Sequence, residues 1–283
     1  MKTVLDVEIT KEALALFTDV TYANSPFWYG ESEKPLKMSI ICPKHKEGHN
    51  KQPLVVWICG GAYKITDRNV WIPEMMTFAS SGYTVASIEY RTSNNAPFPS
   101  AIIDVKSAIR YLKAHALQYC IDSSRIAVLG ESAGGSLASF IGVTQGIPEF
   151  DKGDWLEYSS NVSSVVDYYG ITDMLEEPLH AVGENKYVIQ EFLYNQDGID
   201  LRKKASVLSY ISDDRDIPPF LILHGLKDEL VPISQSRKLY EKLISTGHYA
   251  DLYEIKNAPH GSDYFYQEVV NEIVKKFMKN AGC

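Results

Sequence analysis

The fold is decided by the stretch Arg125-Ile-Ala-Val-Leu-Gly-Glu-Ser-Ala-Gly-Gly-Ser136. Its first five residues are mostly apolar, which is typical of a buried strand, and an apolar helix is expected from about Gly135 to Thr144. Between them, the glycines of Gly130-Glu-Ser-Ala-Gly134 remove side chains that would clash in a tight turn and leave Ser132 strained. The stretch therefore predicts a strand, a sharp turn that presents a serine, and a helix.

Short apolar strands alternate with helices along much of the chain. The clearest helix runs from about Ser100 to Ala116, where apolar residues recur at intervals of three and four. This alternation indicates an α/β fold with a mostly parallel central sheet flanked by helices on both faces. The further strands that we expect are Leu54–Cys59, Tyr83–Ile88, Val162–Tyr169, Phe220–Leu223 and Asp251–Ile255.

Two regions depart from the alternation. Segments near Leu5–Thr10 and Leu36–Cys42 have the pattern of antiparallel edge strands. From about Thr172 to Ser212, polar helix-like segments such as Glu184–Tyr194 interrupt the pattern, and we interpret them as a small helical lid inserted over the carboxyl edge of the sheet. Because the sequence has no internal repeat or low-complexity linker, we predict one domain over residues 1–283.

Composition excludes several classes of function. The 283 residues carry a formal net charge of −8, with 45% hydrophobic and 23% charged residues, as in an ordinary globular protein. No cluster of lysine and arginine suggests nucleic acid as a partner, and no apolar run is long enough to span a membrane. The absence of a signal-peptide pattern and the four widely spaced cysteines predict a cytoplasmic protein with reduced thiols. The sequence is compatible with a homodimer.

Three residues have the types and the order of a catalytic triad. Ser132 would be the nucleophile, His260 follows the last expected strand, and Asp228 follows the strand before it. The carboxyl ends of parallel strands meet at one edge of a sheet, which would bring these side chains together. Glu229 is the substitute candidate for the acid, and His224 is expected to be structural. The pattern Gly130-x-x-x-Gly134-Gly135 matches neither common phosphate-binding glycine spacing.

A second glycine turn follows the strand that ends at Cys59. Glycines at this point allow backbone N–H groups to approach a substrate carbonyl oxygen closely. We predict that the N–H groups of Gly61 and Ala62, with that of Ala133, form an oxyanion hole. No metal and no organic cofactor is needed for this chemistry.

The chain resembles the esterase branch of the α/β-hydrolases, which includes hormone-sensitive-lipase-like enzymes and bacterial feruloyl and acetylxylan esterases. The resemblance runs from about Leu36 to the C-terminus. Its motifs are Trp57-Ile-Cys-Gly-Gly-Ala62, Glu89-Tyr-Arg91, Phe98-Pro99 before a helix with Asp104, the Ser132 turn, Tyr169-Gly170, and the Asp228 and His260 loops. It implies the α/β-hydrolase fold and hydrolysis of short-chain acyl esters, such as acetyl groups on carbohydrates or other small alcohols, through an acyl-serine.

One residue departs from the family pattern. Such enzymes usually carry His-Gly-Gly at the oxyanion turn, and Cys59 takes the place of the histidine here. The donors are backbone groups, so their geometry can persist, but the sequence does not say what braces the turn. A buried thiol at a strand end is more often a small apolar filler than a nucleophile.

The sequence does not decide the substrate contacts or the exact activity. Aromatic residues on or near the loops could frame the mouth of the site, and the candidates are Tyr63, Trp155, Tyr169 and Tyr194. One alternative function is an amidase or peptidase resembling kynurenine formamidase. Another is a binding protein that keeps the fold and has lost catalysis.

Overall fold

The strand, turn and helix predicted at the centre of the chain are present. β5 spans Ile121–Glu131 and α3 spans Ala133–Val143, with Ser132 alone between them. The computed structural model describes residues 1–27, 30–44, 50–176, 188–193 and 198–283. The expected strands and helices other than Leu5–Thr10 are found within one or a few residues of their predicted bounds wherever the chain is described.

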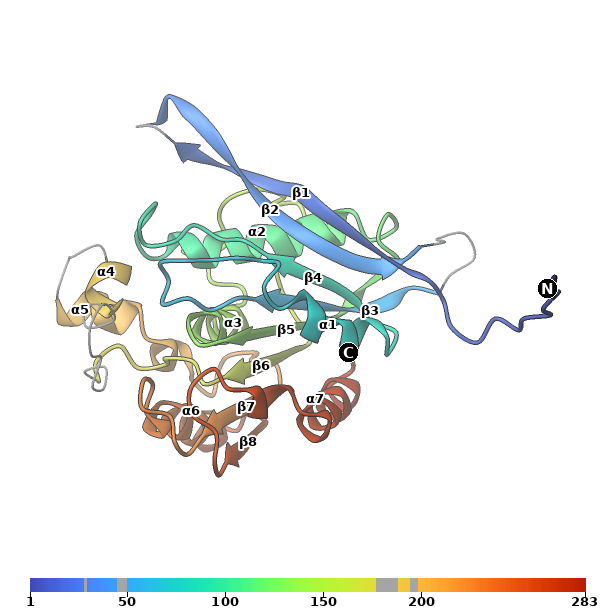
Figure 1. Ribbon diagram of the computed structural model, residues 1–283. Helices are drawn as coiled ribbons and strands as arrows, with labels where there is room; N and C mark the ends of the chain where they lie inside the picture. Colours follow the sequence, from blue (N-terminus) through green and yellow to red (C-terminus); the bar gives the residue numbers. More distant parts are fainter. Residues whose placement is uncertain (28–29, 45–49, 177–187, 194–197) are drawn as a thin grey trace.

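Eight strands of the described chain form a single sheet in the order β1-β2-β4-β3-β5-β6-β7-β8 (Figure 1). The strands from β3 to β8 all run parallel to one another. β2 is antiparallel to both of its neighbours, β1 and β4. The sheet is therefore mostly parallel, as predicted. Besides β5, the strands are β1 (Leu14–Phe27), β2 (Ser32–Pro43), β3 (Gln52–Ile58), β4 (Thr84–Ile88), β6 (Ser164–Tyr168), β7 (Phe220–Gly225) and β8 (Ala250–Ile255).

Helices cover both faces of this sheet (Figure 1). α2 (Ser100–Ala114), α3 and α6 (Ile233–Ser245) contribute to the apolar core on one face. α1 (Ile72–Ala79) and α7 (Glu268–Asn280) contribute to the core on the other. Strand residues alternate between the two cores, which is why the central strands are apolar throughout. The short helices are α4 (Val188–Phe192), α5 (Ile199–Lys204), η3 (Val207–Tyr210) and η4 (Asp263–Tyr266).

The prediction of an edge strand near Leu5–Thr10 is wrong. The outermost strand is β1, which pairs with β2 from Leu14 opposite Pro43 to Phe27 opposite Ser32. Because β2 ends at Pro43, the residues before Ala13 lie beyond the end of their neighbour, and no strand in the described part of the chain pairs with them. The second predicted edge segment, Leu36–Cys42, lies within β2.

The proposed insertion at about 172–212 is only partly described. α4, α5 and η3 lie within it, and Phe192 of α4 stacks on Tyr63, which follows β3, with ring centroids 4.1 Å apart. α4 therefore lies beside the carboxyl edge of the sheet. Residues 177–187 and 194–197 fall outside the described part, so the interpretation as a lid stays a prediction. Among the helices that the structure describes, none is both long enough and apolar enough to cross a membrane.

Candidate active site

The turn between β5 and α3 holds Ser132 in a conformation that few residues adopt. Its φ is +56° and its ψ is −121°, a strained region for a residue with a side chain. A Cβ at Gly130 would collide with the carbonyl of Gly134, and a Cβ at Gly134 would collide with the carbonyl of Ile58. These glycines let the turn pass close to β3 and place Ser132 beyond the carboxyl end of β5.

A chain of hydrogen bonds joins Ser132 to the predicted base and acid. The Nε2 atom of His260 lies 2.9 Å from the Oγ atom of Ser132, and its Nδ1 atom lies 2.7 Å from an oxygen of Asp228. Asp228 follows β7 and His260 follows β8, so the order of the parallel strands brings the three loops together. The substitute candidate Glu229 is exposed and is not part of this chain of bonds.

The surroundings of Asp228 favour its ionised form. Its other carboxylate oxygen accepts hydrogen bonds from the backbone N–H groups of Leu230 and Val231, at 2.9 and 2.8 Å. Burial alone would raise the pKa of Asp228, but hydrogen bonds from His224 and His260 outweigh that effect and hold the pKa well below its usual range. An ionised Asp228 can accept the Nδ1–H of His260 and orient the ring.

His224 has the structural place that the sequence suggested. It is fully buried, with Nε2 2.9 Å from the carbonyl oxygen of Val231 and Nδ1 2.7 Å from the hydroxyl of Ser236. Its Nε2 also lies 3.3 Å from Asp228. His224 therefore ties the acid's loop to the start of α6.

The turn after β3 lies at the same edge of the sheet. Gly61, Ala62 and Tyr63 have successive positive φ values of 120°, 55° and 59°. The carbonyl of Gly61 accepts hydrogen bonds from the N–H groups of Lys64 and Ile65, which closes the turn. The amides of Gly61, Ala62 and Ala133 donate to no other residue that the structure describes. Ala133 also begins α3, where the positive end of the helix dipole lies.

The sequence reasoning missed the group that braces this turn, which is the side chain of Glu131. One of its carboxylate oxygens accepts the backbone N–H of Gly60 at 2.6 Å and the indole N–H of Trp71 at 3.3 Å. Trp71 in turn stacks on Tyr266, in the segment after His260, with centroids 4.6 Å apart. The sequence did contain a signal for this role. Glu131 is the second residue of Gly130-Glu-Ser-Ala-Gly134, and a carboxylate so close to a buried strand needs a hydrogen-bond partner.

Burial raises the pKa of Glu131, although its hydrogen bond to Gly60 and the nearby His260 work in the opposite direction. The Glu131 side chain is only 8% exposed. Its carboxylate therefore lies in a poorly solvated place.

Cys59 contributes its backbone to the turn. The hydroxyl of Tyr90 donates to the carbonyl oxygen of Cys59 at 3.0 Å. Burial, followed by the charge of Glu131, raises the pKa of the Cys59 thiol to about 11, so the thiol stays protonated at neutral pH. A protonated, buried thiol is a poor nucleophile.

The four aromatic candidates for substrate contact have different fates. Tyr63 and Tyr169 lie at this edge but are buried, and the ring of Tyr169 packs against that of His260 at 4.7 Å. The structure does not bring Trp155 to Ser132, Asp228 or His260: its ring packs on those of Tyr111 and His115 at the end of α2. Its indole N–H donates to the carbonyl of Tyr22. Tyr194 lies outside the described residues.

Comparisons with known proteins agree with this architecture. The family model described as BD-FAE matches residues 38–243. The "Probable carboxylic ester hydrolase LipM" of Mycobacterium tuberculosis is 36% identical over 199 residues, which is 68% of this chain and 44% of that protein. "Esterase LipQ" of the same organism is 30% identical over 75% of this chain and 51% of its own length. The chain thus spans about half the length of these curated relatives.

Solved structures with the same fold cover nearly the whole chain. One is described as a "Truncated form of carbohydrate esterase from gut microbiota"; it has a TM-score of 0.77 and 26% identity, over 96% of this chain and 97% of that one. Another, a "Bifunctional GH43-CE" of Bacteroides eggerthii, has a TM-score of 0.80 and 26% identity, over 95% of this chain and 35% of that one. The α/β-hydrolase fold predicted from the sequence is confirmed.

Proposed function

We propose, from the premise that this chain belongs to the BD-FAE family of α/β-hydrolases, that it hydrolyses carboxylic esters with Ser132 as the nucleophile. The observation that carries the proposal is the continuous chain of hydrogen bonds from Ser132 through His260 to Asp228, at 2.9 and 2.7 Å. It ends on a serine held in a strained turn beside amides that have no described acceptor. Relatives named as ester hydrolases support the same reaction.

Each group has a step in the proposed reaction. His260 accepts the proton of Ser132 as its Oγ atom attacks the ester carbonyl, while Asp228 holds the imidazole and stabilises the imidazolium. The resulting oxyanion receives hydrogen bonds from the amides of Gly61, Ala62 and Ala133. His260 then gives its proton to the leaving alcohol. Water, activated by the same imidazole, releases the acid from the acyl-serine.

The proposed substrates are short-chain acyl esters of carbohydrates or other small alcohols. Buried rings crowd the site: Tyr63 stacks on Phe192, and Tyr169 packs on His260. Such packing leaves little room for a long acyl chain and favours an acetyl-sized group. The structural neighbour described as a carbohydrate esterase, 26% identical over nearly the whole of both chains, supports a sugar as the alcohol.

Two measurements test this function. A fluorophosphonate probe is expected to label Ser132, identified by peptide mass spectrometry, and to abolish hydrolysis of p-nitrophenyl acetate in proportion. A panel from acetyl to octanoyl esters, with acetylated xylo-oligosaccharides and feruloyl esters, is expected to give the highest kcat/KM for acetyl groups. Labelling at another residue would overturn the assignment of the nucleophile, and a preference for octanoyl esters would overturn the proposed acyl size.

A further inference from the structure

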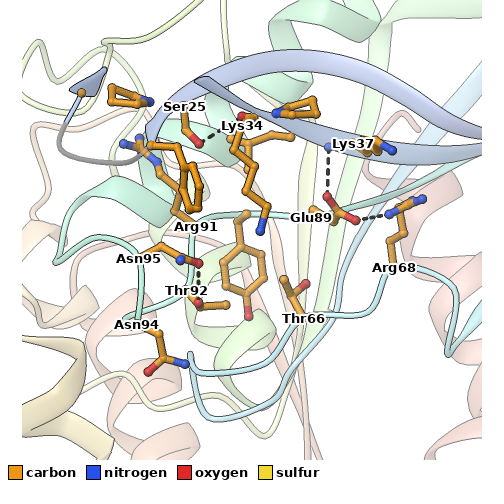
Figure 2. Close-up of a pocket in the computed structure, with 16 residues that line it drawn as sticks. Ser25, Lys34, Lys37, Thr66, Arg68, Glu89, Arg91, Thr92, Asn94 and Asn95 are labelled. Carbon is orange, nitrogen blue, oxygen red and sulfur yellow. Dashed lines mark hydrogen bonds and ion pairs between the residues drawn. The ribbon is translucent and has the colours of Figure 1, made fainter. Parts of the chain in front are cut away.

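A hollow lies at the carboxyl edge of the sheet, beyond the turn that follows β3. It has a volume of about 690 Å³, which lies in the range of small-molecule sites. Its walls come from the end of β1, the start of β2, the turn after β3 and the residues after β4 (Figure 2). We call it the β2 cleft. β2 stands three positions from β5 in the sheet, about 14 Å at the usual spacing of strands.

The β2 cleft is connected to the oxyanion turn by hydrogen bonds. Tyr90, in the cleft wall, donates its hydroxyl to the carbonyl of Cys59. The N–H of Ser93 donates to the carbonyl of Tyr63, and the amide of Asn94 donates to that of Lys64. The residues after β4 that line the cleft are thus hydrogen-bonded to the turn after β3. A substrate long enough to extend past the turn would enter the cleft.

One positive charge in the cleft is neutralised by no carboxylate that the structure describes. Four cationic side chains line it, and three of them have partners among the described residues. Arg68 pairs with Glu89 and Asp19, and Lys37 also pairs with Asp19. The remaining pair, Arg91 with Asp104, is bidentate, with contacts of 2.6 and 2.9 Å to the two carboxylate oxygens.

Lys34 is the fourth cation. Its ammonium forms no ion pair with any residue that the structure describes. In Figure 2 its side chain extends from β2 into the cleft and ends between Arg91 and Glu89. Glu89 is already occupied, because Arg68 and the backbone N–H of Lys37 bind its two oxygens. An anion in the cleft would therefore meet an ammonium without a competing partner.

Two exposed amides give the cleft a polar wall. Asn94 uses its Nδ2 atom on Lys64, which leaves its carbonyl oxygen as an acceptor. Asn95 uses its carbonyl oxygen on the hydroxyl of Thr92, at 3.0 Å, which leaves its Nδ2 atom as a donor. A donor and an acceptor on neighbouring residues suit the hydroxyl groups of a sugar, because each hydroxyl can both donate and accept.

We propose that the β2 cleft is a distal subsite that binds a carboxylate-bearing sugar of a longer carbohydrate ester, with the carboxylate at Lys34. This inference rests on the proposed function at Ser132, because the ester group would lie there while the acidic sugar occupies the cleft. Lys34 would increase specificity through one charge-assisted contact and take no part in bond breaking.

The test compares two acetylated xylo-oligosaccharides of equal backbone length, one of which carries a single glucuronic acid side group. Each rate is divided by the rate of the same variant on p-nitrophenyl acetate, which is too small to reach the cleft. The native chain is expected to prefer the acidic substrate in kcat/KM by about fivefold, as for one charge-assisted contact in a half-exposed place. Higher ionic strength should reduce the preference.

Substitutions assign the preference to the cleft. Lys34→Gln is expected to remove it. Lys51→Gln removes the same charge from an exposed lysine just before β3, at the amino end of that strand, and is expected to keep the preference. Equal preferences in the two variants, or none in the native chain, would overturn the proposal.

Binding separates this inference from the catalytic one. The acidic oligosaccharide without acetyl groups is expected to bind the Ser132→Ala variant in calorimetry, and to bind at least fivefold more weakly when Lys34→Gln is added. Failure to hydrolyse p-nitrophenyl acetate in the native chain would contradict the proposed function alone. Equal binding with and without Lys34 would contradict the subsite alone.

Discussion

Two sets of loops meet at Ser132, and they are held in different ways. On one side, Asp228 and His260 bond directly to each other and to the serine. On the other, the turn after β3 is braced by the side chain of Glu131 and by the hydroxyl of Tyr90, neither of which would touch the reacting atoms. The first side is held by the same groups that we propose carry out the chemistry. The second depends on residues behind the site.

This difference decides how each side should respond to substitution. Loss of a group on the first side removes a chemical step, so the rate should fall by orders of magnitude. Loss of a brace on the second side leaves every reacting group in place and only loosens the backbone donors, so the fall should be smaller. Substitutions on the two sides can therefore break the comparison or sharpen it.

The largest effect is expected for Ser132→Ala, which removes the group that both sides serve. We expect kcat for p-nitrophenyl acetate to fall by at least about ten-thousand-fold, because no acyl-enzyme can form. The strained turn should lose nothing in stability, so the melting temperature and circular dichroism spectrum should match those of the native chain. Substantial turnover by a folded variant would refute the nucleophile and remove the basis of the comparison.

The next effect tests the acid on the first side. Asp228→Asn should lower kcat by up to about ten-thousand-fold, because an amide at this place can hold His260 in the wrong tautomer. Glu229→Gln is the matched control: it removes one carboxylate from the adjacent, exposed position and should cost less than about threefold. Comparable losses in the two variants would mean that the 2.7 Å contact of Asp228 with His260 does not carry the role of the acid.

The sequence predicted that the residues of the first side would lie together, because residue types and chain order carry that signal. Ser132, Asp228 and His260 each follow an apolar run that can be recognised as a strand, and parallel strands bring their carboxyl ends to one edge. The same local signals predicted β5, α3 and the other central elements. The prediction at Leu5–Thr10 failed because alternation describes a strand and says nothing about whether a neighbour is present to pair with it.

The second side could not be predicted to the same extent. The contact between Glu131 and Gly60 joins residues 71 positions apart in the chain, and only the packing of β5 beside β3 creates it. Trp155 failed for a similar reason: an aromatic residue in a loop can pack on several elements, and the contacts of Trp155 are with His115 and Tyr22, which lie outside the site. Contacts that are distant in sequence leave no periodic signal.

The brace gives the third prediction, of intermediate size. Glu131→Ala should lower kcat for p-nitrophenyl acetate by about a hundredfold, with a smaller change in KM, because the loosened donors matter most in the transition state. Glu131→Gln keeps an oxygen that can accept the N–H of Gly60, so it should recover about tenfold of that loss. Steady-state kinetics on the two variants measures both values.

The pH profile then separates the charge of Glu131 from its hydrogen bond. Burial raises the pKa of Glu131, so its carboxylate is lost as the pH falls, whereas the amide of Glu131→Gln has no charge to lose. The acid limb of the kcat/KM profile should therefore move to lower pH in Glu131→Gln, while Trp71→Phe, which removes only the indole donor, should keep the native limb. If Glu131→Ala and Glu131→Gln lost the same amount of kcat and the acid limb did not move, Glu131 would contribute only by packing.

The smallest effect is expected at Cys59, whose backbone, not its thiol, forms part of the second side. Burial raises the pKa of this thiol to about 11, so the thiol is protonated below that pH. At pH 8 only about one molecule in a thousand carries the thiolate. Iodoacetamide should therefore leave Cys59 of the folded chain unlabelled at pH 8, as read by peptide mass spectrometry, and should label it after unfolding in urea. Cys59→Ala should keep kcat within about threefold, because the hydrogen bond from Tyr90 goes to the carbonyl oxygen. Rapid labelling at pH 8 together with loss of turnover in Cys59→Ala would instead place a reactive thiol in the oxyanion turn.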